Sequence, residues 1–135
     1  MAKFVATDFK ITLNGTVLSP SINSVTLDVT SNEVETTTFG STYKTVVGGI
    51  ISGSAKLDFY QDFAAGSVDP VIWPLLNTIG TLVITPTSAT VSATNPSYTA
   101  QVLINNYQPI NASIGDLAGF SVTWPTTGTV TRATA

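Results

Sequence analysis

Two segments of the chain, 22–29 and 53–60, alternate between apolar and polar residues with a period of two. This alternation is typical of a β-strand that has one face in the core and the other in solvent. The apolar side chains share one face of each strand: Val25, Leu27 and Val29 in the first, and Ala55, Leu57 and Phe59 in the second. The polar side chains share the other face: Ser24, Thr26 and Asp28 in the first, and Ser54, Lys56 and Asp58 in the second.

Most of the remaining chain also predicts short strands. Asn14-Gly15 favours a two-residue type I′ turn, which would join a strand over 4–13 to a short strand over 16–18. Further strands are expected in four stretches rich in β-branched and aromatic residues: 81–85, 98–107, 117–124 and 129–131. Strands this short and this numerous are typical of a β-sandwich or a β-barrel.

One segment, over about residues 69–77, predicts a short α-helix. Asp69 is a favourable N-cap, Pro70 suits the first helical position, and Pro74 keeps the helix short. The chain shows no obvious linker, charge block or internal repeat. We therefore predict a single mainly β domain over 1–135, a β-sandwich or barrel with one short helix.

The stretch 31–50 is the least suited to a core. Its apolar residues are isolated among threonines, glycines and acids. A structureless loop of this length is uncommon inside a compact domain and is usually functional or mobile. Two forms remain open: a long loop that orders only on assembly, and a β-hairpin with a turn at Phe39-Gly40.

The composition narrows the possible chemistry. The chain has no histidine and no cysteine, and only 5 basic and 8 acidic residues. Histidine is the usual acid, base and metal ligand near neutral pH, and cysteine is the usual reactive nucleophile. A structural or binding protein is therefore favoured over an enzyme, and we expect no cofactor.

The charge pattern argues against tight binding to nucleic acid, which requires clustered cations. The net charge is −3, and the basic residues are scattered singly: Lys3, Lys10, Lys44, Lys56 and Arg132. The N-terminal residues lack the apolar run of a signal peptide, and no window is long and apolar enough for a membrane helix. We expect a protein that is made, and assembles, in the cytoplasm.

The densest group of acids is Asp58, Asp62 and Asp69. In a strand, Asp58, Tyr60 and Asp62 would share a face, and paired carboxylates can hydrolyse a glycoside or hold Ca²⁺. A solvated strand face that leads into a helix cap explains the same residues without further ligands, and we favour that interpretation. The two tryptophans, Trp73 and Trp124, are expected to anchor the core.

The order of segments over nearly all of residues 3–133 suggests a family. After the Asn-Gly hairpin come INSVTLD, EVETTTFG, GSAKLDFYQD and NPSY, and the chain closes with FSVTWP and GTVTR. In this order the chain resembles the major tail tube proteins of long non-contractile-tailed bacteriophages. Tail terminators and other ring components share this architecture, so the position in the virion stays open.

The resemblance implies a β-sandwich protomer that assembles into hexameric rings, whose strands form an inner β-barrel. The rings would stack into the tail tube of the virion, and the phage genome would pass through without specific binding. Implied partners are further copies of the chain and other tail proteins, namely tape measure, tail terminator and distal tail proteins. No membrane is involved, and no catalytic activity is expected.

Two sets of residues are the candidate sites. We expect the polar strand faces to line the channel, with Ser24, Thr26, Asp28, Ser54, Lys56 and Asp58 directed inward. We expect the long loop or hairpin to contact the next ring through Glu33, Glu35, Phe39, Gly40, Tyr43 and Lys44. Two other classes suit the composition: a secreted or surface carbohydrate-binding, adhesin-type β-sandwich, and a carboxylate hydrolase built on Asp58 and Asp62.

Overall fold

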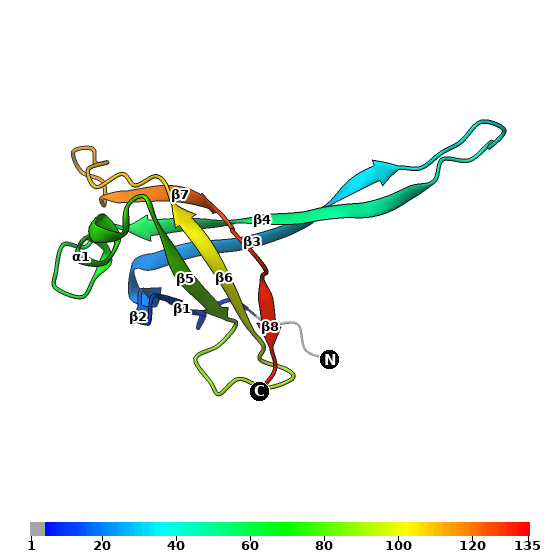
Figure 1. The fold of residues 1–135 in the computed structure, drawn as a ribbon. Helices are drawn as coiled ribbons and strands as arrows, with labels where there is room; N and C mark the ends of the chain where they lie inside the picture. The colour runs from blue at the N-terminus through cyan, green and yellow to red at the C-terminus, as the bar shows by residue number, and fades with distance from the viewer. Residues whose placement is uncertain (1–4) are drawn as a thin grey trace.

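The computed structural model describes residues 5–135, and Figure 1 shows two antiparallel β-sheets with one short helix at their end. The five-stranded sheet has the order β2-β1-β5-β6-β8: β1 Lys10–Leu13, β2 Thr16–Val17, β5 Thr78–Thr85, β6 Ser97–Ile104 and β8 Thr131–Ala133. The three-stranded sheet has the order β3-β4-β7: β3 Ile22–Glu35, β4 Val46–Tyr60 and β7 Gly119–Pro125. The helical turns are η1 Ser19–Ser21, α1 Val68–Ile72 and η2 Trp73–Leu75. The prediction of a mainly β sandwich with one short helix is confirmed.

The core lies between the two sheets, because each long strand turns alternate apolar residues inward. The buried strand residues include Ile11 and Leu13 of β1, Ala55, Leu57 and Phe59 of β4, Leu82 and Ile84 of β5, Ala100, Val102 and Ile104 of β6, and Phe120, Val122 and Trp124 of β7. The Phe59 and Phe120 rings stack with their centroids 4.9 Å apart. Burying one such side chain contributes about 1.5–3 kcal/mol, so this layer supplies most of the driving force for folding.

The Asn14-Gly15 turn has the predicted form. Both residues have positive φ angles, 49° and 84°, as a type I′ turn requires, and Leu13 pairs with Thr16 across it. The Asn14 side chain also accepts a hydrogen bond from the Thr81 amide at 2.8 Å, which ties the turn to β5. The strand that precedes the turn begins at Lys10, later than expected, and the first four residues of the chain lie outside the described residues.

The helix differs from the prediction in its start and its length. Ser67, not Asp69, occupies the N-cap position, and the α-helix ends at Ile72. Pro74 lies in the following 3₁₀ turn, since proline cannot donate the backbone hydrogen bond that would continue the helix. The Asp69 carboxylate instead accepts a hydrogen bond from the Tyr107 hydroxyl at 2.7 Å.

The two tryptophans have different environments. Trp124 is completely buried, as predicted, and its indole N–H donates to the Asn106 carbonyl at 3.0 Å. The prediction for Trp73 was wrong, because its side chain is 58% exposed. The short helix turns Val68 and Ile72 into the core, which leaves Trp73 on the outside with only one side against the Tyr107 ring.

Tyr107 joins the helix to the sheets through side-chain hydrogen bonds. Its hydroxyl donates to Asp69 and accepts from Gln61 Nε2 at 3.0 Å, and Gln61 also donates to the Pro109 carbonyl at 2.8 Å. Burial, together with the hydrogen bond to the Asp69 carboxylate, raises the pKa of Tyr107 to about 12. The phenol therefore stays protonated in the folded protein at pH values where a free tyrosine ionises.

This shift predicts how stability changes at alkaline pH. Between pH 10 and 12 the unfolded chain binds fewer protons at Tyr107 than the folded protein, so the free energy of unfolding falls as pH rises through this window. We expect the fall to be shallower in Tyr107→Phe, as measured by urea unfolding from pH 9 to pH 12. Tyr43→Phe, at an exposed position, is the matched control and should follow the wild-type slope. An equally steep fall in Tyr107→Phe would contradict the assignment.

Candidate assembly surfaces

The β3–β4 hairpin extends far beyond the rest of the molecule (Figure 1). We call residues 30–52 the arm, and every residue in this range is exposed. The third strand of the sheet, β7, pairs with β4 only from Ser54 to Tyr60, so the arm consists of two strands and their turn. The segment that sequence patterns left as either a loop or a hairpin is therefore a projecting hairpin, and within residues 5–135 no third strand pairs with it beyond Ser54.

The tip of the arm is a turn held by backbone and threonine hydrogen bonds. The Ser41 amide donates to the Thr38 carbonyl, and Gly40 between them has a φ of 89°. This geometry suits a type II turn, whose third residue needs a positive φ and is usually glycine. The Thr36 amide donates to the Thr45 carbonyl at 2.8 Å, which closes the strands below the turn. Phe39 and Tyr43 point away from these contacts and are 109% and 85% exposed.

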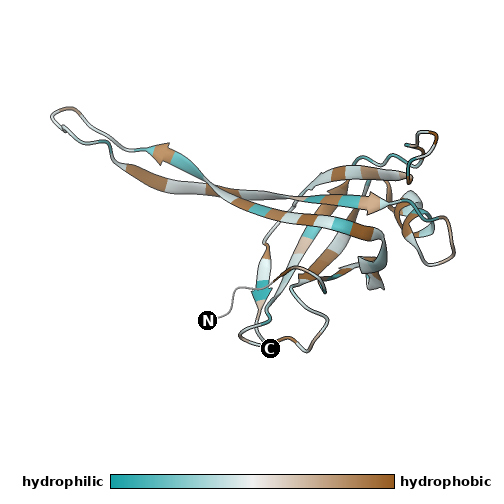
Figure 2. Ribbon diagram, turned by 180° about the vertical axis from the view of Figure 1, so that it is seen from behind, coloured by the Kyte–Doolittle hydropathy of each residue, from teal (hydrophilic) through white to brown (hydrophobic). Residues whose placement is uncertain are grey.

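An extra residue in β4 changes which side of the arm is apolar. Ser31 pairs with Ile51, and the next regular pair is Glu33 with Gly48. Between these pairs β3 advances by two residues and β4 by three, so β4 contains one extra residue, a β-bulge. Paired residues project from the same side of a ladder. Near the body, Val29 and Ile51 therefore continue the core side, whereas Val34 and Val47 lie on the opposite side. Figure 2 shows hydrophobic residues interspersed with polar ones along both strands of the hairpin.

The six residues predicted to contact a neighbouring ring all lie on the arm. Glu33 and Glu35 pair with Gly48 and Val46 on the side opposite Val34, and Lys44 forms an ion pair with Glu33 at 3.0 Å. Both members of this pair are well exposed, so it contributes at most about 1 kcal/mol. Phe39 and Gly40 form the turn, and Tyr43 follows it. All six residues are exposed, so they form no enclosed site.

The six residues predicted to line a channel also lie together. Ser24 pairs with Asp58, Thr26 with Lys56 and Asp28 with Ser54, all on the outer side of the three-stranded sheet. β7 continues this surface with Ser121 and Thr123, and the Ser121 hydroxyl donates to Asp58 Oδ1 at 2.5 Å. The surface is polar, carries two carboxylates and one ammonium, and has a net charge of −1 for each copy.

The three clustered acids do not share one strand face. The predicted common face was wrong, because β4 ends at Tyr60 and Asp62 lies in the loop beyond it. Each carboxylate has its own structural partner: Asp58 accepts from Ser121, Asp62 from the Ala64 amide, and Asp69 from Tyr107. Within residues 5–135 no group of three or more acids is placed to hold a metal ion. No helix in the same range is long and apolar enough to cross a membrane.

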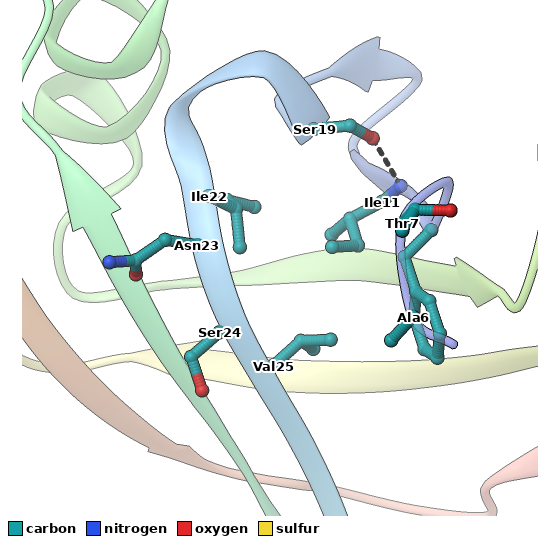
Figure 3. Close-up of a pocket in the computed structure, with 9 residues that line it drawn as sticks. Ala6, Thr7, Ile11, Ser19, Ile22, Asn23, Ser24 and Val25 are labelled. Carbon is teal, nitrogen blue, oxygen red and sulfur yellow. Dashed lines mark hydrogen bonds between the residues drawn. The ribbon is translucent and has the colours of Figure 1, made fainter.

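A hollow of about 310 Å³ lies beside β3 (Figure 3). Ile22 and Val25 point into it toward Ile11 and Ala6, and Asn23 points to the other side. The Ile11 amide donates to the Ser19 hydroxyl at 2.7 Å on its rim. The residues that line the hollow include no acid and no base. Beside it lies β3, whose outer edge has no neighbouring strand within residues 5–135.

A second exposed apolar surface lies at the helix end of the molecule and was not predicted from the sequence. It belongs to the loop 105–118, which carries the exposed side chains of Ile110, Ile114 and Leu117. Part of this loop was expected to be strand, whereas β7 begins only at Gly119. Three isolated apolar residues among Asn, Pro and Gly give no periodic pattern from which such a surface could be identified.

Comparison with known proteins shows a shared fold. No protein-family model matches the chain, and no curated protein matches it. A solved structure described as "Virion of native gene transfer agent (GTA) particle" contains a chain that superimposes with a TM-score of 0.75. The alignment covers 93% of this chain and 95% of that chain, at 12% sequence identity. The two chains therefore share a fold along almost their whole length.

The arm should open easily in the unassembled protein. A two-stranded hairpin without a covered face is only marginally stable in water. We expect backbone amides of residues 36–48 to exchange with solvent orders of magnitude faster than those of 54–60, which lie in the same hairpin but inside the sheet. Hydrogen exchange followed by mass spectrometry measures both segments in one sample. Equal protection of the two segments would show that the arm is rigid in the free protein.

Proposed function

We propose that this chain is a structural virion protein that assembles into stacked hexameric rings and forms a tail tube for the passage of a phage genome. The observation that carries the proposal is the arm, which exposes apolar side chains that nothing in the described chain covers. The fold shared with a chain of a gene transfer agent virion supports a role in a phage-like particle. Assembly would take place in the host cytoplasm.

The surface area supports self-association. The chain exposes 8630 Å² for a mass of 14.1 kDa. A compact monomer of that mass exposes about 6,700 Å². The excess of about 1,900 Å² is close to the total area buried in a standard protein–protein interface, about 1,200–2,000 Å². The exposed arm adds to this area, and an assembly that covers its apolar side chains would gain hydrophobic stabilisation.

The open edge of β3 supports lateral contacts within a ring. β3 has 14 residues, and it is the terminal strand of its sheet. A long open edge promotes pairing with another chain, and a closed ring removes such edges. In this proposal each copy contributes a sheet to an inner barrel. Six three-stranded sheets at about 4.8 Å spacing and about 45° tilt give a backbone diameter of about 40 Å, enough for a duplex roughly 20 Å wide.

The polar side of the three-stranded sheet is the proposed channel lining. Its hydroxyl groups and single net negative charge give phosphates no cluster of cations to bind, so DNA would slide rather than adhere. The arm is the proposed contact between rings, through Glu33, Glu35, Phe39, Gly40, Tyr43 and Lys44. Other proposed partners are the tape measure, tail terminator and distal tail proteins.

The first test is assembly with and without the arm. We expect the concentrated wild-type protein to form rings and tubes in negative-stain electron microscopy. A variant in which Asn-Gly joins Thr30 directly to Ser52 keeps a paired hairpin end and should form rings but not tubes. If the shortened variant still forms tubes, the arm is not needed for stacking and its proposed role is wrong. Persistent wild-type monomers that bind glycans would favour the adhesin class instead.

The second test is the charge of the channel. Asp28→Lys combined with Asp58→Lys should leave tubes intact but make them retain duplex DNA at low salt, with retention lost as salt rises. Thr81→Lys with Gln101→Lys adds two cations to the outer side of the five-stranded sheet and is the control, which should retain little DNA. Filter retention of labelled DNA by purified tubes measures the difference. Equal retention by both variants would show that the polar sheet face does not line the channel.

A further inference from the structure

The helix end of the molecule presents an apolar surface that is fixed in position. Ile110 and Leu117 are well exposed and Ile114 is 105% exposed, on the loop 105–118. Gln61 holds this loop at two points. Its side-chain Nε2 donates to the Pro109 carbonyl, and its backbone N–H donates to the Ala118 carbonyl. Scattered apolar side chains are normal on a surface, but several on one anchored loop indicate a contact site.

The arm and this loop lie at opposite ends of one strand. β4 begins in the arm at Val46 and ends at Tyr60, next to the residue that anchors the loop. Its 15 residues span about 50 Å. Figures 1 and 2 show the arm on one side of the body and the helix and its loops on the other. A second copy shifted along this direction brings its arm tip to the helix end of the first, and the contact then repeats from copy to copy.

The two surfaces are complementary in charge as well as in polarity. In the arm tip, 36–45, the only charged residue is Lys44, which pairs with Glu33 below the tip at 3.0 Å and is still 60% exposed. In the loop 105–118 the only charged residue is Asp116. Each is close in sequence to exposed apolar residues, Phe39 and Tyr43 in the tip and Ile114 and Leu117 in the loop. Opposite charges beside matching apolar groups favour one partner and one orientation.

We propose that the loop 105–118 is the receptor for the arm tip of a second copy of this chain, with Lys44 of one copy facing Asp116 of the next. The proposal rests on the proposed function, because it identifies the surface on which the arm of a stacked ring would dock. Phe39 and Tyr43 would cover Ile110, Ile114 and Leu117, and the contact would bury side chains that are exposed at both ends of the free molecule.

Cysteine cross-linking tests this contact. The chain contains no cysteine of its own, so any disulfide must involve the introduced residues. Ser41→Cys lies in the tip and Ser113→Cys in the loop, and both changes are conservative at exposed positions. Oxidised tubes of the double variant should give a ladder of covalent multimers, and mixed single variants should give only the dimer. Ser41→Cys with Ser88→Cys, which is exposed in a different loop, is the control and should remain monomeric on a denaturing gel.

Exchange of the two charges is an independent measurement. Lys44→Glu and Asp116→Lys should each reduce the amount of sedimenting tube severalfold, because each places like charges together at the contact. The double variant restores an opposite pair and should return tube formation to within about twofold of wild type. Lys44→Glu combined with Asp8→Lys has the same net charge as this double variant, but its tube formation should stay low.

The outcomes separate this inference from the proposed function. Two results would overturn the receptor assignment and leave the tube proposal standing. One is tubes that form but give no Ser41–Ser113 cross-link. The other is a Lys44→Glu variant whose tube formation is restored by Asp8→Lys as fully as by Asp116→Lys. Cross-linking of the control pair to the same extent would also overturn it. Absence of rings and tubes from the wild-type protein would overturn both proposals together.

Discussion

Every backbone amide and carbonyl in a strand needs a hydrogen-bond partner, and β3 finds partners along only one of its edges. In the three-stranded part of the sheet, the one open edge costs little stability, because β4 is flanked by β3 and β7 and its inner face packs into the core. In the arm the same ladder continues, and nowhere in the described chain does a third strand pair with it or a layer bury it. The stability of the hairpin therefore depends on position. The part near β7 is held by the core, and the arm is held by its backbone ladder, a few threonine hydrogen bonds and one exposed ion pair.

Exposed strand edges and apolar side chains are a hazard as well as a means of assembly. Natural edge strands are often protected by charged side chains, which discourage unspecific pairing. Glu33 and Glu35 lie on one side of the arm, with Lys44 close to Glu33, so the distal part carries most of its charge opposite Val34 and Val47. This arrangement leaves one apolar side of the distal arm for a specific partner and makes the other side unfavourable for aggregation.

Local patterns predicted the elements whose residues interact mainly with their neighbours in sequence. The Asn14-Gly15 turn follows from the φ angles that only a few residues adopt, and the 53–60 strand follows from its alternation. The arm was harder to predict, because its apolar residues do not keep to one side. Val34 is out of step with Val29 in β3, and the extra residue in β4 places Val47 on the other side from Ile51. The sequence therefore looked irregular where the structure has two regular strands.

Long-range contacts account for the other differences. Aspartate is a residue type favoured at helix N-caps, but the Asp69 carboxylate instead accepts a hydrogen bond from Tyr107, 38 residues away. The pairing of β3 with β4 brought together the six residues proposed for the channel, since register alone decides which side chains share a face. Which side of a sheet faces a channel depends on the neighbouring copies, and a single chain contains no such information.

The two kinds of proposed contact differ in whether they close. Lateral pairing along the edge of β3 closes after a fixed number of copies, so it limits itself. The contact between the arm and the loop 105–118 is heterologous and runs along β4, so each added copy presents the same free surface as the last. Growth in that direction has no internal limit. In the proposed assembly, the length of the tube must therefore be set by another component, which is the physical reason to expect a length-determining and a terminating partner at its ends.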